Sequence, residues 1–307
     1  MAIISECTFT DFELLKVKEV VIDNSSIGLA NECSFELPVF AYPSDTTDTY
    51  RNDFSSSLLT LSNRYSTPKF YLEEETSCDN WTEISELTDS TYGLYYSEAS
   101  LNPYWRGFKI QWYKVYNLEG VGCYRIRQEY IDVTDSSTKI NYSYKYNLKL
   151  YSDNLADKTS KMTYTINGGK IGSTQDDEVV VDYGSVIWER ELRLPNSFFG
   201  FESSEYTREA TRYKNGGQTP IEDSQVETLQ FNAKRLPYSL HREIKITALQ
   251  SGELYLSDYN LGNVATYDHK RVQPSSEYAP NWGTYRSYAS VSLTFEPYFQ
   301  NLRRKRC

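Results

Sequence analysis

The sequence predicts a mainly β protein made of tandem β-sandwich-like domains, the second of which carries one packed α-helix. Composition is the first reason. The 307 residues include 28 Tyr, 13 Phe and 5 Trp, and aromatic side chains fit the pleated, half-buried surface of a sheet. The second reason is that short runs of alternating apolar and polar residues, separated by turn residues, recur along the whole chain. The length suits two ordinary domains or one large all-β domain.

The first half is expected to consist of strands joined by polar loops. Residues 12–22 (FELLKVKEVVI) and 35–42 (FELPVFAY) each predict a strand, because both are rich in apolar residues and both end at turn residues. The polar segment 43–57 between strands is too long for a tight hairpin. It is therefore a candidate contact loop.

A hairpin is expected further along, with strands over 108–116 and 123–131 joined through Gly120 and Gly122. The two glycines would supply the unusual backbone angles of the turn. The alternation in 123–131 predicts one apolar face and one charged face, which we expect to meet solvent or another subunit. The first face carries Tyr124, Ile126 and Gln128, and the second carries Arg125, Arg127 and Glu129.

The polar segment SDNLADKTS at 152–160 marks the expected junction between an N-terminal domain over 1–155 and a C-terminal domain over 156–307. In the second domain, Asn-Gly-Gly triplets at 167–169 and 215–217 each predict a hairpin turn. Further strands are expected over 227–236 and 286–300, and a strand followed by a loop over 254–260.

One helix is expected, near residues 238–250. Pro237 stands at its start and Gly252 after its end, which are the positions these residues favour around helices. Its apolar residues recur at helical spacing and would form the buried face. They are Leu240, Ile244, Ala248 and Leu249.

Motifs for catalysis or metal binding are not found in the sequence, so we expect a non-enzymatic protein without cofactor or metal. His241 and His269 are its two histidines, too few for a His-centred site, and His241 is expected to cap or pack within the helix. The acidic runs at 73–75 and 176–178 lack the alternate spacing of calcium ligands, so we interpret them as solvated loops. Ser257, Asp258 and Asn260 in the 257–260 segment (SDYN) are interpreted as turn formers.

An alternative function is glycan binding by a fibre or adapter module, since exposed aromatic rings stack on sugars. The segment YWRGFKIQWY at 104–113 contains Trp105 and Trp112. The two residues are seven apart, so a continuous strand would place them on opposite faces. A platform of two rings is therefore not expected. A carboxylate-based glycosidase ranks below this alternative.

Charge indicates how the chain meets partners. The formal net charge is −10, which disfavours a duplex-binding role. The one strongly basic cluster consists of Arg303, Arg304, Lys305 and Arg306, which we interpret as a solvated tail or as a contact to an acidic neighbouring subunit. The N-terminus carries no signal-peptide pattern, and no apolar run approaches the length of a membrane span. We therefore expect synthesis in a cytoplasm and no membrane partner.

Three segments in a fixed order carry a resemblance to known proteins. They are WERELRLPNSFFGFESSEYTRE (188–209), LPYSLHREIKITALQSGELYLSDYN (236–260) and the final strand SYASVSLTFEPYFQ, with YKVYNLEGVGCYRIR (113–127) upstream. Together they resemble virion structural proteins of crAss-like podoviruses. Within that group the sequence looks like the ring or collar proteins that stack between the portal and the tail hub.

This resemblance implies a bacteriophage neck or tail protein that is made in the host bacterial cytoplasm and ends up in the virion. It implies a closed homo-oligomeric ring with tandem β-sandwich domains, in contact with neighbouring portal, ring or tail-hub proteins. Genomic DNA would pass through the lumen during DNA ejection without sequence-specific binding. The acidic composition would suit such a channel, because a negative wall repels phosphates.

Overall fold

A computed structural model describes most of the chain from residue 36 onward. The described residues are 36–44, 51–60, 69–77, 80–88, 90–96, 105–132, 134–152, 159–167, 170–171, 181–182, 187–195, 197–213, 218–258, 268–282, 288–297 and 301–304. The strand expected over 12–22 and the acidic run at 176–178 lie outside them.

The strands before residue 151 form two sheets that share a core. They are β1 (Glu36–Ala41), β2 (Phe54–Thr60), β3 (Lys69–Ser77), β4 (Asn80–Glu86), β5 (Gly93–Tyr96), β6 (Trp105–Gln111), β7 (Gly122–Asp132), β8 (Ser137–Tyr142) and β9 (Lys145–Leu150). The larger sheet has the order β1-β9-β7-β3-β4 with β8 beside β7, and the smaller is β2-β6-β5. Phe70 of β3 meets Phe108 of β6 edge to face at 4.8 Å between ring centroids, so the two sheets are packed through side chains.

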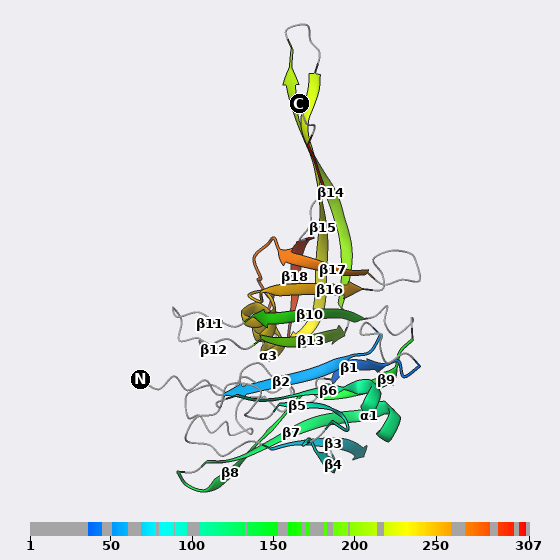
Figure 1. Ribbon diagram of the computed structural model, residues 1–307, viewed down its shortest axis with the longest axis vertical. Coiled ribbons are helices and arrows are strands. Elements are labelled where there is room, and N and C mark those ends of the chain that lie inside the picture. Colours follow the sequence, from blue (N-terminus) through cyan, green and yellow to red (C-terminus); the bar gives the residue numbers. More distant parts are fainter. Residues whose placement is uncertain are drawn as a thin grey trace.

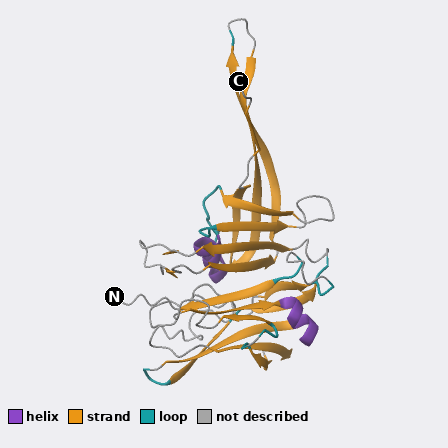
Figure 2. Ribbon diagram, in the orientation of Figure 1, coloured by secondary structure: helices purple, strands orange, loops and turns teal. Residues whose placement is uncertain are grey.

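The strands from residue 159 onward form one eight-stranded sheet and one short ribbon, β11-β12. They are β10 (Thr159–Asn167), β11 (Lys170–Ile171), β12 (Val181–Asp182), β13 (Ile187–Pro195), β14 (Ser197–Arg212), β15 (Gln218–Pro237), β16 (Glu253–Asp258), β17 (Asp268–Pro274), β18 (Tyr288–Pro297) and β19 (Asn301–Arg304). The order is β13-β10-β16-β17-β18-β15-β14, with β19 beside β15. Strands dominate both groups (Figure 2), and the predicted mainly β, sandwich-like fold class is confirmed.

The molecule is elongated (Figure 1). The sheets of β1–β9 lie at one end, the eight-stranded sheet lies in the middle, and the hairpin of β14 and β15 projects far beyond it at the other end. The edge strand β13 faces β1 and β2 of the first group. None of the described helices is long and apolar enough to cross a membrane.

The expected helix is present as α3 (Tyr238–Glu243), continued by a π-helical turn, η2 (Ile244–Ala248). Pro237 is its N-cap residue. Leu240, Ile244 and Ala248 are fully buried and Leu249 is partly buried against the same core, which confirms the predicted apolar face. The helix therefore packs onto the eight-stranded sheet as the sequence indicated.

The hairpin expected through Gly120 and Gly122 is wrong. The strand ends at Gln111, and residues Trp112–Glu119 form the helix α1. Gly120 has a φ of 93° and caps this helix, with its N–H donating to the carbonyl of Tyr116 at 2.9 Å. Residues 123–131 do form a strand, β7, whose Tyr124, Ile126 and Gln128 are buried.

The two Asn-Gly-Gly triplets have different outcomes. The hairpin expected around 215–217 is confirmed by its strands, because Arg212 of β14 pairs with Gln218 of β15. The hairpin expected at 167–169 is wrong, because β10 pairs with β13 and β16 whereas β11 pairs with β12. The chain leaves the sheet after Asn167 and returns as β13.

Candidate functional site

The carboxylate of Asp53 joins the two groups of sheets. Asp53 immediately precedes β2 and accepts hydrogen bonds from Arg193 of β13, at 2.6 Å from Nε and 2.7 Å from Nη2. The backbone N–H of Phe40 in β1 donates to the same carboxylate at 2.8 Å. Asp53 is only 2% exposed. A buried bidentate Arg–carboxylate pair fixes orientation as well as distance.

Lys161 and Glu191 complete this cluster. The Lys161 ammonium lies 3.2 Å from Asp53 Oδ1 and 2.9 Å from Glu191 Oε2, and Glu191 Oε1 accepts from the N–H of Phe54 at 3.2 Å. We call Asp53, Lys161, Glu191 and Arg193 the ionic junction. Two cations and two carboxylates lie there in buried contact. Each carboxylate also accepts a hydrogen bond from a backbone N–H of the first group of strands.

A second buried charge pair ties α3 to the same region. Arg190 of β13 bonds Glu243 of α3, with Nε to Oε1 at 3.1 Å, and its Nη1 donates to the carbonyl of Ser56 in β2 at 2.5 Å. The Tyr164 hydroxyl donates to Glu243 at 2.7 Å. Helix α3, β13 and β2 therefore meet through one guanidinium.

The junction shifts the pKa values of its two carboxyls in opposite directions. Burial acts to raise the pKa of Asp53, but the charges of Arg193 and Lys161 outweigh it and lower that pKa to about 2. Burial raises the pKa of Glu191 to about 8, and the nearby Asp53 charge adds to the effect. Between these two pKa values, the favoured state of the pair has Asp53 ionised and Glu191 protonated.

These shifts predict how stability depends on pH. The pKa of Asp53 is depressed from 3.8, so its contribution is lost as the pH falls from about 4 to about 2. The pKa of Glu191 is raised from 4.5 to about 8, so folding becomes less favourable as the pH rises through that interval. Glutamine does not titrate. Between about pH 5 and about pH 8, the interval set by the two pKa values of Glu191, we therefore expect the melting temperature of Glu191→Gln to fall less than that of the wild type. A decline identical to that of the wild type would contradict the shift.

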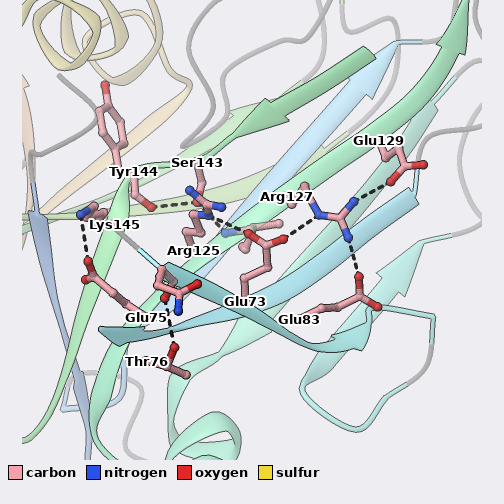
Figure 3. Close-up of polar contacts among 12 residues, drawn as sticks. Glu73, Glu75, Thr76, Glu83, Arg125, Arg127, Glu129, Ser143, Tyr144 and Lys145 are labelled. Carbon is pink, nitrogen blue, oxygen red and sulfur yellow. Dashed lines mark hydrogen bonds and ion pairs between the residues drawn. The ribbon is translucent and has the colours of Figure 1, made fainter. Parts of the chain in front are cut away.

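A network of charged side chains covers one face of the β3-β4-β7 sheet, and Figure 3 shows its ion pairs. Glu73 lies at its centre and accepts from Arg125 Nε at 2.7 Å and from Arg127 Nε at 2.6 Å. Arg127 also pairs with Glu83 at 2.5 Å and with Glu129 at 2.6 Å. The interpretation of residues 73–75 as a solvated loop is wrong, since they belong to β3 and Glu73 is 6% exposed.

Aromatic rings hold the arginines of this face in place. The guanidinium of Arg125 lies 4.2 Å from the Trp81 ring centroid and 4.0 Å from that of Tyr142. Arg127 lies 4.2 Å over Tyr71. Stacking and ion pairing together order these long side chains. The face is thus a polar surface whose arginines are held by both ion pairs and rings.

Glu73→Gln is expected to lower the free energy of unfolding by about 1–3 kcal/mol, because two guanidiniums lose their shared buried charge partner. Glu83→Gln is the matched control. Its carboxylate is half exposed, so we expect a loss below about 1 kcal/mol. Urea unfolding of both variants measures the difference, and equal losses would contradict a central role for Glu73.

The third feature is the hairpin formed by β14 and β15, which we call the arm. Their register runs from Ser197↔Ala233 to Arg212↔Gln218. On the other side of β15, β18 pairs only with the base of the arm, up to Leu229. Beyond that point the arm projects away from the body (Figure 1).

The basic cluster predicted for subunit contact begins on this arm. Arg303 is the register partner of Asp223, and Arg304 is that of Glu222, because β19 pairs with β15. Opposite charges at facing positions favour strand pairing. Lys305 and Arg306 lie outside the described residues.

The remaining predicted site residues are separate from these features. Trp112 is 0% exposed, and its indole N–H donates to the Ser55 hydroxyl at 3.0 Å, so it cannot stack on a sugar. Trp105 belongs to β6, and its side chain is outside the description. His241 is a buried packing residue, as predicted, with Nδ1 2.7 Å from the Tyr278 hydroxyl oxygen.

The interpretation of the 257–260 segment as a turn is wrong at its start. Ser257 is buried within β16, and Asp258 ends that strand opposite Asp268. Tyr259 and Asn260 lie outside the described residues. In the described part of the chain, no three His, Cys, Asp or Glu side chains are grouped so that they could hold a metal ion.

Comparison with known proteins adds no family to these observations: no family model matches the chain, and neither does any curated protein. Fold and geometry therefore define it as an elongated β protein with a buried ionic junction and a projecting strand arm.

Proposed function

We propose that the chain is a structural subunit of a bacteriophage neck or tail, a ring or collar protein that surrounds part of the DNA exit channel between portal and tail hub. The observation that carries this proposal is the arm, which extends beyond the body of the molecule (Figure 1). The order of the segments at 188–209 and 236–260, which resembles that in ring and collar proteins, supports it as well.

The composition of the arm favours a role in assembly. Its outer part, ESSEYTREATR in β14 and QTPIEDSQVE in β15, contains few apolar residues. A ribbon of this kind buries little apolar area by itself and is marginally stable in water. Contacts with neighbouring subunits would stabilise it, and a ring supplies such contacts on both sides.

The buried charge clusters would serve the same function. A ring subunit must hold its parts at a fixed angle, because small errors would add up around the circle. The bidentate pair of Asp53 and Arg193 and the contact of Arg190 with Ser56 both link the two groups of sheets. Charge pairs of this kind specify geometry more than they add stability.

The proposal is tested on the purified full chain by native mass spectrometry and electron microscopy. A ring protein gives a discrete mass that is a whole multiple of 35.6 kDa, and particles with a central hole. A chain that stays monomeric, alone and with the portal protein, would contradict the proposal.

Deletion of residues 302–307 is expected to weaken assembly while leaving the fold intact. The deletion removes most of β19, which among the described strands pairs only with the outer part of β15 at Glu222–Gln225, and it removes none of the core residues that the structure describes. The dissociation constant of the assembly should rise at least tenfold, with an unchanged circular dichroism spectrum. Unchanged assembly would rule out a role for this segment.

A further inference from the structure

Residues 275–282, which we call the strap, follow β17 and lie against helix α3. The Tyr278 hydroxyl oxygen is 2.7 Å from Nδ1 of His241. The Trp282 ring meets the imidazole edge to face, with 5.1 Å between ring centroids. Tyr278 packs against the core, whereas the residues on either side of it are exposed. The strap is therefore attached to α3 through inward-facing rings.

Backbone hydrogen bonds hold both ends of the strap on β18. The N–H of Ser275 donates to the carbonyl of Thr294 at 2.9 Å. Near the other end, Asn281 and Ser290 donate to each other's carbonyls at 2.8 and 3.3 Å. Between these anchors, the hydrogen bond to His241 holds the middle of the strap on the helix.

The partners of His241 determine which of its ring nitrogens carries hydrogen. Nε2 lies 3.1 Å from the carbonyl oxygen of Ala289. A carbonyl can only accept, so Nε2 bears the hydrogen. In a neutral imidazole Nδ1 then keeps a free lone pair and accepts from the Tyr278 O–H. This link between strap and helix therefore requires a neutral ring.

Neutral groups of three elements face the imidazole. The strap contributes the phenol of Tyr278 and the indole of Trp282. The carbonyl of Ala289 faces it from β18, and that of Leu236 from β15. His241 itself is 3% exposed. A protonated imidazole would thus be buried among neutral partners, which is unfavourable.

The carboxylates nearest in sequence do not offset this cost. Glu243, on the same helix, binds Arg190 and Tyr164, and Glu277 of the strap is exposed. In the part of the chain that the structure describes, no carboxylate forms an ion pair with His241. Burial lowers the pKa of His241 below its ordinary 6.5, and the carbonyl contacts act in the opposite direction. The covered ring is therefore most stable when neutral.

We propose that the strap is a pH-sensitive latch, which is closed on α3 while His241 is neutral and leaves the helix when the imidazole binds a proton. A protonated Nδ1 can no longer accept from the Tyr278 O–H, and opening gives the charged ring access to water. The latch does not depend on the ring function proposed above, so a failure of one leaves the other standing.

Acid opens the latch because the open state binds the proton more tightly. An accessible imidazole has a pKa of about 6.5, and the pKa of the covered ring is lower. Closure is therefore favoured above pH 6.5, and this preference is lost as the pH falls below that value. Between about pH 8 and about pH 5, the ratio of open to closed molecules should rise by up to ~30-fold.

The fluorescence of Trp282 measures this opening. The sequence contains five tryptophans, so the signal of Trp282 is obtained as the difference between the natural chain and Trp282→Phe. We expect this difference to change between about pH 8 and about pH 5, with a midpoint below 6.5, because the indole leaves the imidazole. A difference that stays constant over this interval would overturn the proposal.

His241→Gln and His269→Gln are matched substitutions that remove the two histidines of the sequence one at a time. His269 belongs to β17. Each variant is measured with and without Trp282→Phe. We expect the pH-dependent difference to be lost in His241→Gln and retained in His269→Gln. The same transition in both variants would overturn the role of His241.

Nuclear magnetic resonance of His269→Gln with isotope-labelled histidine follows His241 alone and leaves that residue unchanged. At about pH 8 the nitrogen shifts should place the hydrogen on Nε2. Tyr278→Phe loosens the strap, so it should raise the pKa of His241 toward 6.5. Hydrogen on Nδ1 instead, or a pKa that Tyr278→Phe leaves unchanged, would contradict the latch.

Discussion

Asp53→Asn is expected to lower the free energy of unfolding by about 3–5 kcal/mol, the range found when one partner of a buried ion pair is removed. The substitution leaves the shape of the side chain almost unchanged. It removes the charge to which Arg193 binds through two hydrogen bonds and Lys161 through one. Two cations would then face only Glu191, whose own pKa is raised. Urea unfolding at pH 7 measures the loss.

Asp135→Asn is the matched control for this change. The residue is exposed, and its carboxylate accepts a local hydrogen bond from the N–H of Ser137 at 2.8 Å. We expect a loss below about 1 kcal/mol. If the two variants lose the same stability, the ionic junction does not hold the two groups of sheets together.

Arg190→Met is expected to destabilise the chain by a similar amount, about 3–5 kcal/mol. Glu243 is 3% exposed and would be left buried without its guanidinium partner. The carbonyl of Ser56 would lose its donor as well. The change should therefore loosen both α3 and the contact between β13 and β2. Thermal unfolding followed by near-UV circular dichroism measures this loss.

The double variant Arg190→Met with Glu243→Gln distinguishes lost charge pairing from lost packing. Glutamine removes the buried charge but still accepts the hydrogen bond from the Tyr164 hydroxyl. Because replacing both members of a buried pair costs less than removing one, we expect the double variant to be more stable than Arg190→Met alone. If the loss of stability in the double variant equals the sum of the losses in the two single variants, the two charges act independently.

Strands with one clear core face could be predicted from the sequence. β18 alternates, and its Ala289, Val291, Leu293 and Phe295 are all buried. The hairpin of β14 and β15 was predictable for a local reason, since the Asn-Gly-Gly triplet between them is a hairpin signal. In such segments the periodicity and the turn residues indicate the same structure.

Helix α1 could not be predicted in this way. Its sequence, WYKVYNLE, is aromatic and β-branched, which favours a strand by propensity. Tertiary packing decides instead, because Trp112 and Val115 are fully buried as part of the core. Short segments depend on such contacts more than on propensity.

The ionic junction gives no local signal either. In β13 (IWERELRLP), charged and apolar residues alternate over Glu191–Leu194, as they would in a strand with one solvent face. Glu191 and Arg193 are nevertheless buried, because the loop before β2 supplies Asp53 from more than a hundred residues away. Sequence spacing cannot reveal a partner at that distance.

The proposed function is tested most directly by counting this chain in virions. Quantitative mass spectrometry of purified phage particles would compare its copy number with that of the portal protein. A ring or collar protein should be present in the same number as the portal protein or in a simple multiple of it. Absence from the particle would contradict the proposed function.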